Sequence, residues 1–186
     1  MRTLSREESM RPLRKLVAGA SYNVIAKINR DECILTDKAF KELFLTVIKE
    51  AKKKYDFSIS TFCILDNLVK MIISPGPREN LSRIMQWILS VFAVRYNRIK
   101  KIHGHVWYDR FKSSVIDTMS LLHAAFTHIT ESPLLYNINS PVMYLYNGIN
   151  CILRGDYSLI ERPPNHLLPL IEKLSEYAVS QHKWPA

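Results

Sequence analysis

Hydrophobic and polar positions along the chain follow two periods, the two-residue period of strands and the 3.6-residue period of helices. Residues 16–29 partly alternate, which predicts a first strand. Asp37 is placed to begin a helix, because its carboxylate can accept the free amide hydrogens of a first turn. Apolar residues then recur at helical spacing from Phe40 to Ala51, so we expect a helix up to about Lys54.

The middle of the chain predicts a hairpin followed by a long helix. Residues 57–65 and 68–73 are rich in Ile, Phe, Val and Thr, and the polar pair Asp66-Asn67 between them favours a tight turn. A proline-glycine-proline breaker comes next. An amphipathic helix is then expected over residues 80–101.

Two further elements complete the order of a split βαβ fold. Residues 111–117 predict a strand, and residues 118–132 predict a helix. The order is therefore strand, helix, strand, strand, helix, strand, helix. This order predicts an α+β, ferredoxin-like antiparallel sheet with helices packed on one face.

The last part of the chain predicts a helical C-terminal extension. A short helix is expected within residues 141–153 and a final helix near residues 166–181, with Pro163-Pro164 between them. We therefore expect one domain over residues 1–150 and the extension over residues 151–186.

Composition adds a charge pattern to this picture. The chain has 186 residues and is 47% apolar, so it is large enough to bury a hydrophobic core. Its net charge of +9 means that basic side chains outnumber acidic ones. Residues 1–30 hold seven Arg or Lys against two Glu, and residues 95–112 hold six against one Asp. Clustered positive charge favours a polyanionic partner through counterion release, with a merely solvated basic face as the alternative.

The cysteines and the apolar runs indicate the cellular compartment of the protein. Cys33, Cys63 and Cys151 form no CxxC pair, which suits a reducing environment and indicates no zinc site. No apolar run reaches membrane-spanning length, and the first residues lack the apolar core of a secretory signal. We expect a cytoplasmic protein without a membrane partner.

Four short blocks in a fixed order carry a family resemblance. They are residues 20–24 (ASYNV), 63–73 (CILDNLVKMII), 80–87 (NLSRIMQW) and 104–113 (GHVWYDRFKS). Together they resemble the REP-associated tyrosine transposases, the IS200-like group of HUH single-strand DNA transposases, over roughly residues 12–135. The resemblance implies a ferredoxin-like sheet and a DNA substrate that is single-stranded or folded as a hairpin.

The resemblance also implies where the catalytic groups would lie. Relatives carry a pair of metal-binding histidines on a central strand, which bind Mg or Mn, and this pair falls at Leu68 and Lys70. Their nucleophilic tyrosine and a third, amide ligand fall at His128 and Ser132, one helical turn apart. Asn23 stands where relatives often have histidine.

All of these positions hold other residue types. Leu68 and Lys70 offer no lone pair to a metal at neutral pH, and neither His128 nor Ser132 is the expected residue. A metal-dependent nuclease needs a full ligand set and a positioned nucleophile. We therefore expect no intact catalytic residue, no metal ligand and no cofactor, and a protein that binds DNA without cutting it.

Charge, aromatic residues and family position together predict the nucleic-acid contacts. The ammonium of Lys70 either holds a phosphate at the vacated metal position or extends to solvent. The candidate contacts are Arg95, Arg98, Lys100, Lys101, His105, Trp107, Tyr108, Arg110, Lys112 and Lys70, together with Arg14 and Lys15 near the N-terminus. A homodimer is left open, because relatives include both dimers and monomers.

Two other functions stay open on the sequence. One is an active strand-transfer enzyme with a site rebuilt from His103, His105, His123 or His128. The other is a protein-interaction module whose basic patch is incidental. The first requires divalent-ion binding and a covalent protein–DNA adduct, and the second requires DNA binding without preference for hairpins.

Overall fold

The computed structural model describes residue 17 and residues 19–180, and these residues contain every predicted strand and helix. The strands are Ser21–Lys27 (β1), Phe57–Ile64 (β2), Leu68–Pro75 (β3) and Lys112–Ile116 (β4). The α-helices are Lys38–Lys54 (α1), Leu81–Lys100 (α2), Met119–Glu131 (α3), Gly148–Leu153 (α4) and Leu168–Ser180 (α5). Short 3-10 helices cover Asn29–Asp31 (η1), Ile34–Thr36 (η2), Ser132–Tyr136 (η3) and Asn165–Leu167 (η4).

Polar side chains fix where the three long helices of the sheet unit begin. The Asp37 carboxylate accepts a hydrogen bond from the Ala39 backbone amide at 2.9 Å, as the sequence predicts. The side-chain oxygen of Asn80 accepts from the Ser82 amide at 2.8 Å. Thr118 caps α3 in the same way. Each cap satisfies amide hydrogens that have no partner inside the helix.

The four strands form one antiparallel sheet in the order β2-β3-β1-β4. β2 and β3 make a hairpin around the predicted Asp66-Asn67 turn, which is closed by a 2.9 Å bond from the Leu65 amide to the Leu68 carbonyl oxygen. β1 lies between β3 and β4, as the ferredoxin-like order requires. The predicted α+β class and antiparallel sheet are confirmed.

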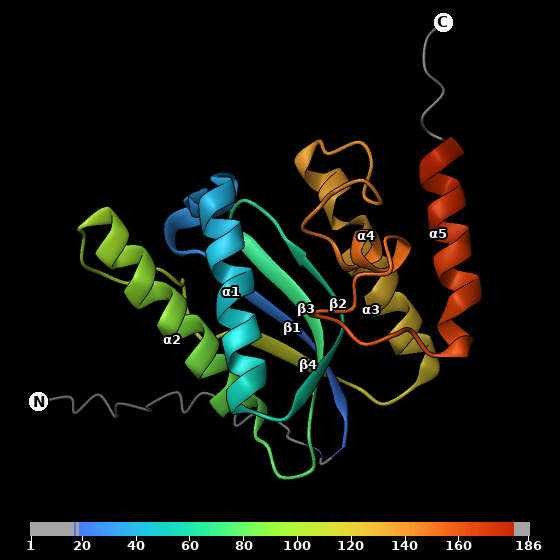
Figure 1. Cartoon of the computed structure of the whole chain (residues 1–186), viewed down its shortest axis with the longest axis horizontal. Coiled ribbons are helices and arrows are strands. Elements are labelled where there is room, and N and C mark those ends of the chain that lie inside the picture. The colour runs from blue at the N-terminus through green and yellow to red at the C-terminus, as the bar shows by residue number, and fades with distance from the viewer. Residues whose placement is uncertain (1–16, 18, 181–186) are drawn as a thin grey trace, which may run out of the picture.

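Helices cover both faces of this sheet (Figure 1). α1 and α2 lie together on one face, where they pack against Val69 and Met71 of β3. α3, α4 and α5 lie on the opposite face, where Phe126 of α3 packs with Ile72. The expectation of helices on one face holds for α1 and α2 and must be corrected for α3. The physical reason is that β3 is apolar on both sides, so both sides need cover.

The C-terminal segment closes the outer edge of β2. The Ile64 amide donates to the Tyr146 carbonyl oxygen at 2.9 Å, and the Glu161 amide donates to the Ile59 carbonyl oxygen at 2.8 Å. These bonds occupy backbone groups that an edge strand would otherwise leave unpaired. α4 spans the expected division at residue 150 and packs against β2, so the tail and the sheet share a core.

Candidate nucleic-acid interface

Three of the four positions that the family resemblance marks meet on the α3 face of the sheet. Lys70 Nζ donates to Ser132 Oγ at 2.8 Å and lies 3.4 Å from His128 Nε2. Lys70 is 5% exposed and Ser132 is 1% exposed, whereas His128 is exposed. Leu68, the fourth position, is partly exposed and projects from the same side of β3, because strand side chains alternate.

The hydroxyl of Ser132 links the two elements that carry this cluster. It donates to the His128 carbonyl oxygen at 2.6 Å, one turn back along α3, and accepts from the Lys70 ammonium. Among the described residues Lys70 forms no ion pair, so its charge rests on neutral acceptors. The Lys70 side chain thereby ties β3 to the end of α3.

Partial desolvation shifts two pKa values in this cluster. Burial lowers the pKa of Lys70, and burial together with the Lys70 ammonium lowers the pKa of His128. A neutral His128 can accept from the ammonium through Nε2. Cys63 faces Lys70 across the β2–β3 ladder, and burial raises the pKa of its thiol to about 12, so it provides no thiolate.

The residues present do not fit the divalent ion that the family resemblance implies. An ion needs lone pairs from several converging ligands, and the ammonium of Lys70 places a positive charge between the two remaining polar groups, His128 and Ser132. In the described part of the chain no three His, Cys, Asp or Glu side chains are grouped as metal ligands require. A cation of the protein itself stands among these side chains.

The same sheet face carries further positive charge toward the β4 edge. Ile25 of β1 is the register partner of both Lys70 and Lys112, so the two lysines project from one face two strands apart, about 10 Å between Cα atoms. Lys112 is exposed. Lys27 lies two residues after Ile25 on the same face of β1, and its ammonium forms an ion pair of 2.6 Å with Asp31. Lys112 is therefore the exposed cation of this face whose charge the ion pair of Lys27 does not offset.

The basic residues at the end of α2 divide into engaged and exposed groups. Arg95 binds Glu50 of α1 through two hydrogen bonds of 2.9 and 2.7 Å, which compensates its charge. The Lys100 ammonium lies 5.1 Å from the centre of the Phe40 ring. Arg98, Lys100 and Lys101 are all exposed, and the ring contact of Lys100 leaves its charge accessible.

The two predicted stacking rings differ in role. Trp107 is half-buried, and its Nε1 donates to the Leu89 carbonyl oxygen at 2.9 Å, so it anchors the loop to α2. Tyr108 is 69% exposed and presents its ring to solvent. Arg110 is exposed as well. His105, another candidate, is tied to η1 by a 3.4 Å hydrogen bond from the Asn29 side chain to its carbonyl oxygen.

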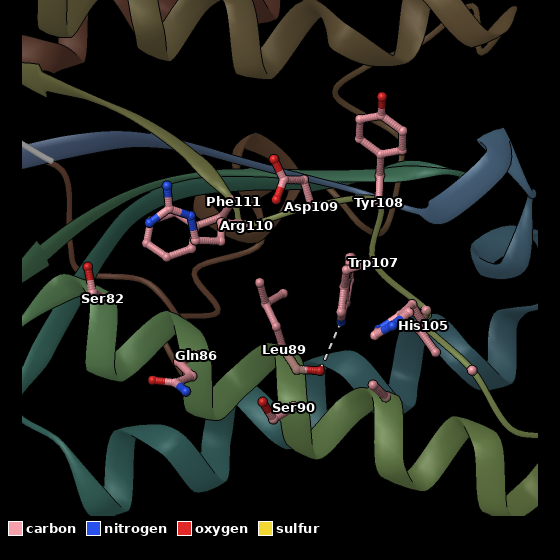
Figure 2. Close-up of a pocket in the computed structure, with 13 residues that line it drawn as sticks. Ser82, Gln86, Leu89, Ser90, His105, Trp107, Tyr108, Asp109, Arg110 and Phe111 are labelled. Atoms are coloured by element: carbon pink, nitrogen blue, oxygen red, sulfur yellow. Dashed lines mark hydrogen bonds between the residues drawn. The ribbon is translucent and has the colours of Figure 1, made fainter. Parts of the chain in front are cut away.

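A groove of about 750 Å³ lies between α2 and residues 104–111 (Figure 2). Its apolar floor includes Leu89 and Trp107, and α2 contributes the polar residues Ser82, Gln86 and Ser90. These three were not among the sequence candidates. Their spacing of four residues, which puts them on one side of a helix, is the signal that could have found them.

The other sequence candidates do not join this interface. Arg14 and Lys15 lie outside the described residues. His103 and His105 follow α2, while His123 and His128 lie on α3 across the sheet, so no rebuilt site brings the four histidines together. No helix within the described ranges is long and apolar enough to cross a lipid bilayer.

Comparison with known families identifies the class of protein to which this fold belongs. The model of the family described as "Transposase IS200 like" matches residues 17–125, more than half of the chain. The chain belongs to the IS200-like transposase family. No curated protein matches its sequence.

The comparison with solved structures gives one match that shows a shared fold and one weaker match. The REP-associated tyrosine transposase bound to a REP hairpin superposes with a TM-score of 0.65 at 17% identity, covering 80% of this chain and 88% of that one. At this identity the likeness shows a shared fold. A Deinococcus radiodurans R1 protein assigned as a transposase gives a TM-score of 0.46 at 10% identity, covering 69% of this chain and 97% of its own.

Proposed function

We propose that the protein is a non-cleaving member of the IS200-like family that binds hairpin or single-stranded DNA. The single observation that carries this proposal is the position of the Lys70 ammonium, 2.8 Å from Ser132 Oγ and 3.4 Å from His128 Nε2. It stands among the side chains at the family's catalytic positions. The family reaction uses a metal and a tyrosine, and these positions hold no tyrosine and no converging set of metal ligands.

The charge distribution supports retained DNA binding. Lys112 on the α3 side of β4, Arg110 beside the groove, and Arg98 and Lys101 at the end of α2 are exposed cations. Each can contact a phosphate, and Tyr108 adds an exposed ring for an unpaired base. The similar transposase structure was determined with a REP hairpin, which makes hairpin DNA the first ligand to test.

An active enzyme with a rebuilt site and a protein-interaction module are the alternatives. The first needs a new set of ligands, and the four histidines considered for it lie on opposite faces of the sheet. The second finds support in exposed apolar side chains between α3 and α4, including Leu135 at 73% and Met143 at 71% exposure. DNA selectivity separates it from the proposed function.

A competition titration tests the proposal. A labelled hairpin with single-stranded flanks competes against duplex and unstructured strands of equal length, at 50 and 200 mM salt. With about four phosphate contacts, log Kd should change with log salt by a slope of about 3. Hairpin preference that persists at the higher salt supports the proposal. Equal and steeply salt-dependent binding of all three DNAs contradicts it and favours the interaction module.

A further inference from the structure

The groove beside α2 has the size and walls of a ligand site, and the proposed function uses only Tyr108 and Arg110 of the residues that line it. Its volume of about 750 Å³ falls within the range of about 300–1,000 Å³ that is typical of small-molecule sites. Residues 104–111 form one wall and α2 forms the other (Figure 2). It lies on the α2 side of the sheet, away from the Lys70 cluster on the α3 side.

The floor of the groove contains a rigid aromatic ring. The Trp107 indole is held by a 2.9 Å hydrogen bond from its Nε1 to the Leu89 carbonyl oxygen. The rings of Phe44 and Phe92 lie behind it, with ring centres 5.9 and 5.5 Å from that of the indole. The indole is half-buried and lines the groove. A ring that is already fixed offers a stacking surface without losing further side-chain entropy on binding.

The α2 wall supplies polar groups beside this ring. Gln86 is exposed, lines the groove and forms no hydrogen bond with any other described residue. Its amide offers a donor and an acceptor side by side, as the polar edge of a nucleobase does. Ser90 lies one turn further along α2 on the same wall. The groove thus combines a flat apolar surface with a bidentate polar edge.

Positive charge stands where the backbone of such a ligand would pass. Arg110 lines the groove and is exposed, and Lys112, the first residue of β4, is exposed on the α3 side of the sheet, opposite its register partner Ile25. β4 is an edge strand, so a DNA strand can pass around it from one face to the other. A phosphate backbone that runs along this edge would bring its bases to the groove mouth.

We propose that this groove binds an unpaired nucleobase of the bound DNA, stacked on Trp107 with its polar edge on Gln86. The inference rests on the proposed function, because it requires a DNA ligand. Stacking in the groove would make the affinity for DNA depend on its bases, which phosphate contacts alone do not.

A steric block provides the test. Ser90→Trp fills the groove from the exposed surface of α2, and Thr46→Trp, on the exposed surface of α1, adds the same ring elsewhere. Affinity is measured in the full chain for one hairpin with six-nucleotide flanks that carry either normal bases or abasic sugars. Wild type and Thr46→Trp should bind the base-bearing hairpin about tenfold or more tightly than the abasic one, since each stacked base contributes at this level.

For Ser90→Trp that ratio should fall severalfold, to the level that stacking on Tyr108 alone provides, with unchanged affinity for the abasic hairpin. The unchanged value also shows that the variant is folded. A wild-type ratio of 1, or a Ser90→Trp ratio equal to that of wild type, would overturn the groove assignment while hairpin binding stands. Absence of binding to both DNAs would overturn the proposed function and the groove assignment together.

Discussion

Lys70 Nζ lies 2.8 Å from Ser132 Oγ, and this contact joins a central strand to the end of a helix on the α3 face of the sheet. Both residues are buried, and the serine hydroxyl is also bonded to the His128 carbonyl oxygen. The two positions correspond to metal ligands in the family resemblance. In this chain the interaction between them is a hydrogen bond from an ammonium to a hydroxyl.

Removing the hydroxyl should destabilise the protein more than removing the charge. Ser132→Ala leaves a buried ammonium with only His128 as acceptor and should cost about 1–3 kcal/mol in the free energy of unfolding. Lys70→Met keeps an unbranched side chain one atom shorter and removes the buried charge, so stability should be unchanged or higher. Urea denaturation of both variants measures these changes.

The double variant checks that the two effects have one cause. In the Lys70→Met background, Ser132→Ala should cost at least about 1 kcal/mol less than in wild type, because no ammonium is left without its acceptor. Additive effects of the two substitutions would contradict the contact as a source of stability.

Stability should depend on the protonation of His128. Its pKa is lowered below the ordinary value of 6.5, chiefly by burial and then by Lys70, so the folded state disfavours the imidazolium. The contribution is complete above pH 6.5 and is lost as pH falls through the lowered folded pKa. His128→Asn should therefore lose less thermal stability than wild type between pH 7.5 and pH 5.

His166→Asn, a change of the same type on the exposed η4 segment, serves as the control for that comparison. Identical Tm decreases in wild type and His128→Asn would contradict a role for the imidazole in the cluster.

DNA affinity should distinguish the two arginines near the end of α2. Arg98 is exposed, and Arg98→Ala should reduce the slope of log Kd against log salt by about 0.7–0.9. Arg95 is held by Glu50, so Arg95→Ala should leave that slope nearly unchanged. Salt titrations of hairpin binding measure both, and equal slope changes would show that the Glu50 pair opens when DNA binds.

The contact between α4 and β2 should not tolerate a side chain at Gly148. A Cβ there would lie 2.9 Å from the Phe62 backbone nitrogen and 3.0 Å from the Thr61 Cα, closer than such atoms pack. Gly148→Ala should destabilise the whole protein by about 1–3 kcal/mol, because the tail and the sheet share a core. Ser120→Ala on the exposed surface of α3 should change stability by less than about 0.5 kcal/mol. A separate, earlier unfolding step of the tail would contradict the shared core.

The sequence predicted local elements well, because their signals are local. Asp37 caps the helix it was expected to cap, the second long helix begins beside Asn80 as expected, and Asp66-Asn67 forms the hairpin turn. The face on which α3 packs was not predicted, because an amphipathic pattern says which side of a helix is buried and not against which face of a sheet. The buried run from Val69 to Ile73 was a usable signal, since an antiparallel strand with one wet face alternates.

The candidate site was predicted in part. The replaced positions at Lys70, His128 and Ser132 were identified from the family blocks, and the structure brings them together. The engagement of Arg95 by Glu50 was not predictable, because it joins residues 45 positions apart on different helices. The Trp107 anchor depends on a helix carbonyl group, which no sequence pattern marks.

The measurement that tests the central claim most directly is an adduct assay on the bound complex. The full chain is incubated with the flanked hairpin and magnesium or manganese, at concentrations at which binding is verified in the same samples, and an active family member is run in parallel. A stable non-covalent complex with no denaturation-resistant protein–DNA adduct and no cut strand is the expected result. A covalent adduct that requires the divalent ion would contradict a non-cleaving protein.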